Sequence, residues 1–260
     1  MNIRANQIGF SQRIRLEWLK YTANLILAGN NHEAVQKALK HLLEQKLSVG
    51  GAAQRGNREK AITILMKIWA NVPSGLERLR DKGLILLRDT PQEQQIAVHW
   101  GMTMAVYPFW GAVAVNVGRL LRLQGTAAAL HIQRRVREQY GERDTVSRAA
   151  RRVIRTFVDW KVLAETDSKG LYRQGLSIRI DEPELVAWLI EAALRARPSG
   201  ALPLRTLLDS PSLFPFRLKH VSTDRLAASL EEVEFLRHGL DEDVIMLKEP
   251  RVAPRGFLQG

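Results

Sequence analysis

A run of 25 residues without Asp, Glu, Lys or Arg limits what this chain can fold into. The run lies between Glu93 and Arg119 and reads QQIAVHWGMTMAVYPFWGAVAVNVG. Its length is enough to cross a bilayer, so a membrane helix is one interpretation. However, Pro108 divides the run near its middle, His99 and three amides interrupt it, and amphipathic helices flank it. We therefore predict two buried helices that break at Tyr107-Pro108, and no membrane association.

The composition is that of a folded, strongly basic protein. Hydrophobic residues make up 45% of the 260 residues, which is enough for a substantial core. The chain has 39 Lys and Arg residues against 27 Asp and Glu residues, a net charge of +12. Such an excess favours a polyanionic partner, either nucleic acid or an anionic membrane surface, and nucleic acid suits a core-forming chain better. The alternatives are a basic protein that merely stays soluble, or one that docks on an acidic partner subunit.

The absence of cysteine narrows the possible chemistry. With no Cys in the chain, disulfides, Cys-based zinc sites and thiol catalysis are excluded. The first ten residues, MNIRANQIGF, lack the long apolar stretch of a signal peptide. We therefore expect a protein of the reducing cytoplasm.

Residues 1–125 are predicted to form an N-terminal helical bundle. Apolar residues recur at helical spacing throughout, and Gly and Asn residues punctuate the pattern. The bent apolar pair supplies the predicted centre of its core, with the Trp and Met residues used for packing. The expected helices cover 11–27, a stretch capped by Asn31, a stretch capped by Asn57, 74–87, and the broken pair over 92–124.

A more basic pattern follows Gly125. Residues 126–141, TAAALHIQRRVREQYG, favour a helix, and Gly141-Glu142-Arg143 favours a short turn. Asp144 can then cap a longer helix, TVSRAARRVIRTFVDWKVL. Its apolar residues recur at steps of three and four and form one continuous inner stripe. The members of this stripe are Val146, Ala149, Ala150, Val153, Ile154, Phe157 and Val158.

A β-hairpin is predicted directly after this helix. Residues 162–166 suit a short strand, 167–170 (DSKG) a turn, and 171–173 the return strand. A helix, a tight turn, an amphipathic helix and a hairpin follow one another in the order of a winged helix-turn-helix. Residues 126–175 resemble that superfamily, and the stretch VIRTFVDWKVLAETDSKGLYR carries the resemblance.

The charges of this stretch indicate DNA as the partner. Eight arginines lie between Arg134 and Arg155, against three acidic residues. A winged helix-turn-helix places its second helix in the major groove and its wing on the neighbouring backbone, where arginines can contact phosphates and guanine edges. The alternative is a protein–protein module whose arginines are only a solvated face. The candidate DNA-contacting residues are Arg134, Arg135, Arg148, Arg151, Arg152, Arg155, Lys169 and Arg173.

The C-terminal third is predicted to be a small α+β domain over residues 179–250, after a winged-helix domain over 126–178. Asp181 can cap a helix that runs to about residue 197, and 201–215 is expected to be a loop with a short helix. Short strands are expected at 216–221, 233–239 and 243–250, around a helix at 223–231. Residues 251–260 are predicted to be a basic tail.

No motif in the chain points to catalysis. None of the six histidines lies in an H-x-x-x-H or H-E-x-x-H frame, and the G-x-S-x-G, Walker and G-x-G-x-x-G patterns are absent. The histidine pair His220 and His238 is better explained by structural or exposed roles than by a metal site. We therefore expect a protein that is not an enzyme and has no cofactor or metal.

The overall plan resembles the BrxA family of BREX phage-defence proteins over about residues 10–165. The likeness consists of an N-terminal helix pair, a basic loop before NREKAITILMKIW, a central apolar pair, and a basic helix-turn-helix with RRVIRTFVDW. The resemblance implies a non-enzymatic DNA-binding accessory protein of a bacterial multi-protein defence system. Two alternatives stay open: an assembly or scaffold subunit that docks partner proteins, and a dimeric transcription repressor. Duplex RNA is a further possible partner.

Overall fold

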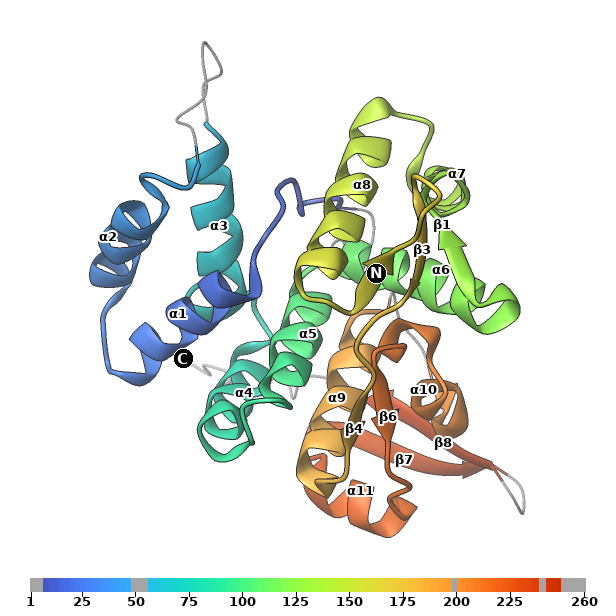
Figure 1. The fold of residues 1–260 in the computed structure, drawn as a ribbon. Helices are drawn as coiled ribbons and strands as arrows, with labels where there is room; N and C mark the ends of the chain where they lie inside the picture. The colour runs from blue at the N-terminus through green and yellow to red at the C-terminus, as the bar shows by residue number, and fades with distance from the viewer. Residues whose placement is uncertain (1–6, 48–55, 198–200, 239–241, 249–260) are drawn as a thin grey trace, which may run out of the picture.

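The computed structural model describes residues 7–47, 56–197, 201–238 and 242–248 (Figure 1). Within these residues the chain is mostly helical, with three small sheets in its second half, which agrees with the predicted mostly-α class. Six helices precede the first strand, and their order follows the prediction. They are α1 (Leu16–Leu27), α2 (His32–Leu43), α3 (Asn57–Trp69), α4 (Glu77–Asp89), α5 (Gln95–Val106) and α6 (Pro108–Gln124).

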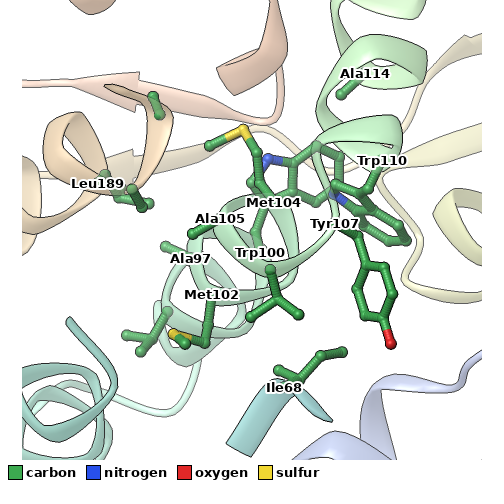
Figure 2. Close-up of a cluster of buried hydrophobic side chains, with 14 of the residues drawn as sticks. Ile68, Ala97, Trp100, Met102, Met104, Ala105, Tyr107, Trp110, Ala114 and Leu189 are labelled. Carbon is green, nitrogen blue, oxygen red and sulfur yellow. The ribbon is translucent and has the colours of Figure 1, made fainter. Parts of the chain in front are cut away.

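The charge-free run forms the predicted bent pair of helices. Helices α5 and α6 meet at Tyr107-Pro108 with a bend of 118°. Among the described residues no single helix is long and apolar enough to cross a membrane, and only this bent pair passes that test, taken together. Every residue of α5 from Ile96 to Val106 is buried. Figure 2 shows the pair at the centre of a cluster that also includes Ile68 of α3 and Leu189 of α9 (Pro183–Arg195).

An aromatic cluster joins this pair to the second half of the chain. The Trp100 ring stacks on Phe157 with centroids 4.8 Å apart, and Trp110 meets Phe157 edge-on at 4.7 Å. Trp160 lies 5.1 Å from Trp110, and Phe214 lies 5.5 Å from Trp100. The buried residues accordingly form one continuous core. The predicted domain limits at residues 125, 178 and 250 therefore fall within a region that shares this core. These limits stay predictions.

Several predicted helix starts are wrong, and for the first two a long-range contact gives the reason. The helix expected from Ser11 begins only at Leu16, because the irregular chain before it forms hydrogen bonds with a distant helix, as described below. Asn57 is the first residue of α3 and not its cap, since its side-chain oxygen accepts a hydrogen bond from Gln12 at 3.0 Å. Asp144 likewise lies inside its helix. The cap expected at Asn31 is confirmed, since Asn31 Oδ1 accepts from the Ala34 amide at 2.9 Å.

Residues 126–174 form two helices and a three-stranded antiparallel sheet. Helices α7 (Ala129–Tyr140) and α8 (Asp144–Asp159) lie between β1 (Thr126–Ala128) and the hairpin of β2 (Leu163–Glu165) and β3 (Leu171–Gln174). The predicted hairpin is confirmed. The helix expected from residue 126 is wrong in its first turn, because residues 126–128 pair with β3, Ala127 opposite Tyr172. The strand order is β1-β3-β2.

The remaining chain forms a small α+β region, as predicted. Sequence patterns missed the strand at 178–180, which pairs in parallel with 216–218, and α9 begins at Pro183 and not after Asp181. The tail, residues 251–260, lies outside the described residues. The elements besides α9 are β4 (Ile178–Ile180), β5 (Leu202–Pro203), α10 (Leu204–Leu208), a 3-10 turn (Pro211–Leu213), β6 (Phe216–Leu218), α11 (Thr223–Ser229), β7 (Val233–His238) and β8 (Glu242–Leu247).

One glycine allows α6 to approach this region closely. A Cβ added at Gly118 would lie 2.0 Å from the carbonyl oxygen of Pro211, a distance that no side chain tolerates. At the next turn of α6, the Arg122 guanidinium donates to the Asp209 carbonyl at 2.7 Å. Helix α6 is therefore held against the 3-10 turn on one side and against α7 and α8 on the other.

Candidate nucleic-acid interface

Helix α8 separates an apolar side from a basic side. Six of the seven residues of the predicted stripe are fully buried, and Val158 is half-buried. This stripe packs α8 against α7 and α6. The positions between the stripe residues carry the four arginines Arg148, Arg151, Arg152 and Arg155. The burial of the stripe therefore fixes which side of α8 these arginines occupy, and the prediction of that stripe is confirmed.

The two arginines in the first half of α8 are exposed. Arg148 and Arg151 have no ion-pair or hydrogen-bond partner for their guanidinium groups among residues 7–47, 56–197, 201–238 and 242–248. Each therefore presents a full set of donors to solvent. Five N–H donors in a planar fork match the oxygens of a phosphate or the edge of a guanine.

Arg152 is turned toward the protein. Its guanidinium donates a hydrogen bond to the backbone carbonyl of Ser11, and the residue is half-buried. Burial lowers the pKa of Arg152 from its usual value, and the like charge of Arg148 lowers it further. The structure thus assigns this guanidinium an internal acceptor, which makes it less available for a ligand than its two neighbours.

Arg155 is also engaged within the protein. It forms an ion pair with Glu165 at the end of β2. The hydrogen bond to Glu165, followed by one with Tyr172, raises the pKa of Arg155 above its usual value. The side chain therefore links α8 to the hairpin.

The two candidates on α7 lie on its outer side. Ile132 and Val136 are the buried residues of this helix, whereas Arg134 and Arg135 are exposed. Arg134 pairs with Glu138 one turn later, with an N–O distance of 3.0 Å. Arg135 has no such partner among the described residues. An exposed pair at this spacing contributes only about 0.3–0.5 kcal/mol, so Arg134 can exchange Glu138 for another anion at small cost.

The two candidates on the hairpin, Lys169 and Arg173, lie at different parts of its surface. Lys169 is exposed in the turn between β2 and β3. Arg173 is exposed on β3, where it lies between Thr126 of β1 and Ala164 of β2. Because side chains alternate along a strand and Tyr172 is buried, Arg173 faces the outer side of the sheet, away from α8. The eight predicted residues therefore occupy several surfaces, and α8 carries the largest group.

The acidic residues of this region are mostly neutralised. Residues 126–175 contain eleven Lys and Arg against six Asp and Glu. Four of these acids form ion pairs, namely Glu138, Glu142, Asp159 and Glu165. Asp144 and Asp167 have no ion-pair partner among the described residues. The uncompensated charge is therefore strongly positive, and it includes the N-terminal half of α8.

Sequence reasoning missed two charged residues that belong to this surface. Arg143, the residue before α8, is exposed, and its guanidinium is 3.3 Å from the Tyr140 carbonyl. Arg13 forms a two-fold ion pair with Asp159 near the end of α8, and this hydrogen bond raises the pKa of Arg13. The position of Arg143 in the turn between the two helices could have indicated that it belongs to this surface. No sequence pattern could have indicated the role of Arg13, because 146 residues separate it from Asp159.

In the part of the chain that the structure describes, no group of three His, Cys, Asp or Glu residues could hold a metal ion. The arrangement on α8 offers exposed donors and positive charge, and its chemistry is anion binding. No protein-family model, curated protein or solved structure matches this chain.

Proposed function

We propose that this protein binds duplex DNA through a winged helix-turn-helix formed by residues 126–175. The element order β1, α7, α8, β2, β3, with β3 in the middle of the sheet, supports this assignment. Helix α6 packs against both α7 and α8, so its C-terminal part would serve as the first helix of the module. In this arrangement α8 is the helix that enters the major groove, and the turn at 167–170 is the tip of the wing.

One observation carries the DNA proposal. Arg148 and Arg151 extend from the first half of α8 with no internal partner among the described residues, although the fold requires no charge there. A positive charge that has no internal partner, on the exposed side of a helix whose apolar stripe is buried, favours an external anion. The B-form major groove admits a helix, whereas the deep, narrow major groove of duplex RNA does not, which favours DNA.

The proposed binding mode depends mainly on phosphate contacts. Arg148 and Arg151 would lie in the groove, and Arg135 and Lys169 would contact the backbone on either side. Each neutralised phosphate releases a counterion, so the affinity should fall steeply as salt increases. No base sequence follows from these residues, and the protein itself is proposed to be non-enzymatic.

Fluorescence anisotropy with a labelled duplex, measured over a series of salt concentrations, tests this proposal. We expect binding that weakens with salt, and a large loss of affinity in the triple variant Arg135→Ala, Arg148→Ala, Arg151→Ala. The matched control is Arg205→Ala, Arg217→Ala, Arg225→Ala, which removes the same charge from exposed positions in the C-terminal region. Equal losses in both variants, absence of binding at low salt, or binding to duplex RNA alone would overturn the proposal.

The cellular setting that we propose is a bacterial phage-defence system, in which the protein acts as an accessory subunit. Its support is the resemblance of residues 10–165 to the BrxA family together with the basic surface of α8. The measurement is the efficiency of phage plating on bacteria that carry the complete gene cluster. Protection should be lost with the triple variant on α7 and α8 and retained with the charge-matched control.

Two leucines favour an assembly subunit as the second candidate function. Leu123 at the end of α6 and Leu130 at the start of α7 are 81% and 78% exposed, and they flank β1. Large apolar side chains at such exposure suit a protein interface. If this candidate is correct, Leu123→Glu with Leu130→Glu should abolish co-purification with the products of neighbouring genes while DNA binding is unchanged. Loss of DNA binding in the same variant would contradict it.

A further inference from the structure

We infer that the N-terminal segment, residues 7–15, limits the entry of α8 into the DNA groove to its first two turns. This inference rests on the proposed DNA-binding function and adds to it the way in which the helix is presented. It assigns Arg148 and Arg151 to the DNA, and it makes Arg152 and Arg155 positioning residues that hold α8 in place.

The N-terminal segment runs along the second half of α8. The Ile14 amide donates to Thr156 Oγ1 at 3.2 Å, and the Trp160 indole donates to the Ile14 carbonyl at 2.9 Å. Ser11 accepts from Arg152, and Arg13 pairs with Asp159. Three residues of α8 (Arg152, Thr156 and Asp159) and its C-cap Trp160 therefore contact one non-helical stretch of chain.

This contact is anchored by buried side chains. Phe10 and Ile14 are fully buried, and the Phe10 ring lies 5.0 Å from Trp110 and 5.4 Å from Tyr107. Gln12 donates a hydrogen bond to the side chain of Asn57 at the start of α3. To expose the second half of α8, the chain would have to withdraw two core residues and break these hydrogen bonds. The N-terminal segment is therefore expected to stay in place when a ligand binds.

The hairpin contacts the same half of α8. Arg155 reaches Glu165 on β2, whereas Arg152 reaches the N-terminal segment. The second half of the helix thus contacts both the N-terminal segment and the hairpin. The first half has none of these contacts, and it carries the exposed Thr145, Arg148 and Arg151.

The free length of α8 matches the size of the groove. The helix has 16 residues, and at 1.5 Å per residue it is about 24 Å long. Residues 144–151 span about 12 Å of that length. The major groove of B-DNA is about 12 Å wide and about 8.5 Å deep. End-on entry to the full depth of about 8.5 Å would take up most of these first two turns and bring the N-terminal segment up to the phosphate backbone.

Salt-dependent binding of four single variants of the full chain tests this inference. For Arg148→Ala and Arg151→Ala, we expect the slope of log affinity against log salt to become less steep by about one, because each removes one positive charge that displaces a counterion from the DNA. For Arg152→Ala and Arg155→Ala, we expect an unchanged slope, whatever happens to the affinity. Arg152→Gln and Arg155→Gln remove the charge but keep a side-chain hydrogen-bond donor, and they serve if the alanine variants do not fold. Arg205→Ala is the control away from the module.

Hydrogen exchange of the wild-type protein gives a second readout that needs no variant. On saturation with a duplex, the amides of residues 7–15 should exchange no faster than in the free protein. Faster exchange there, or a slope change for Arg152→Ala equal to that for Arg148→Ala, would overturn the inference while the DNA-binding function stands. Absence of any duplex binding by the wild type would overturn both.

Discussion

Arg152 donates a hydrogen bond to the backbone carbonyl of Ser11, although 141 residues separate the two in the sequence. The bond connects the middle of the basic helix to the start of the described chain. An arginine that looks like a ligand contact in the sequence is thus part of the internal structure. The distinction between Arg152 and its neighbours leads directly to measurable differences in stability and binding.

Arg152→Ala is expected to lower the free energy of unfolding by about 1.5–3 kcal/mol, the range for a hydrogen bond that involves a charged group. Chemical denaturation measures this difference. Arg151→Ala, one residue earlier and exposed, should change the stability by less than about 0.5 kcal/mol. Equal effects for the two variants would contradict the internal role of Arg152.

Gly118→Ala should destabilise the protein by about 3 kcal/mol, because the new methyl group would collide with the Pro211 carbonyl and force α6 away from the 3-10 turn. This cost exceeds the gain of about 1 kcal/mol that alanine brings to a helix over glycine. Thermal unfolding provides the measurement. Arg119→Ala, at the next and exposed position of α6, is the control and should be close to neutral. A stabilised Gly118→Ala protein would show that the close approach is absent.

His99 should make the protein sensitive to acid. The ring is fully buried, neither ring nitrogen has a hydrogen-bond partner among the residues that the structure describes, and burial lowers the pKa of His99 to about 3. The unfolded chain has a histidine pKa near 6.5, so it binds the proton first as the pH falls. Stability is therefore fully present above about pH 6.5 and decreases by about 1.4 kcal/mol per pH unit between there and pH 3.

His99→Leu tests this origin of the acid sensitivity. An apolar side chain of similar size leaves no unpaired ring nitrogen, so we expect little change at pH 7.5 and a flatter dependence of stability on pH between 6.5 and 4. Urea unfolding at several pH values supplies the comparison. His41→Leu, at an exposed position on α2, should retain the steep wild-type profile. An unaltered profile in His99→Leu would assign the acid sensitivity to other groups.

Asp144→Asn should strengthen DNA binding. Asp144 is exposed in the first turn of α8, where its charge would face the phosphates that Arg148 attracts. A unit charge about 7 Å from a phosphate contributes about 0.6 kcal/mol in water, so we expect an affinity gain of about threefold at low salt. Asp224→Asn, in the first turn of α11, is the matched control and should leave the affinity unchanged. A weaker complex with Asp144→Asn would place this end of α8 away from the DNA.

The sequence predicted those elements whose signals are local. The stripe from Val146 to Phe157 repeats at helical spacing and is buried as expected. The turn DSKG lies between two short apolar stretches and forms the predicted hairpin. Pro108 marks the break of the apolar pair. In each case, neighbouring residues carry the whole pattern, so no distant partner is needed to recognise it.

Elements stabilised by distant partners were not predictable in this way. Residues 126–128 have no strand pattern of their own and become a strand because Thr126 pairs with Arg173. The non-helical chain before Leu16 is held by hydrogen bonds of Ile14 with Thr156 and Trp160. The candidate arginines share this limit: helical spacing places Arg148, Arg152 and Arg155 on one side of α8, but only the fold shows which of them already have partners.

The aromatic cluster around Trp100 has a consequence for synthesis on the ribosome. Trp100 belongs to α5, yet its neighbours include Phe157, Trp160, Phe214 and Phe216. While the chain emerges, the bent pair, which ends at Gln124, is exposed before the later residues up to Phe216 are available to cover it. We expect a nascent chain halted near residue 125 to bind chaperones and to aggregate once released, and productive folding to begin only when the region around residue 216 has left the exit tunnel.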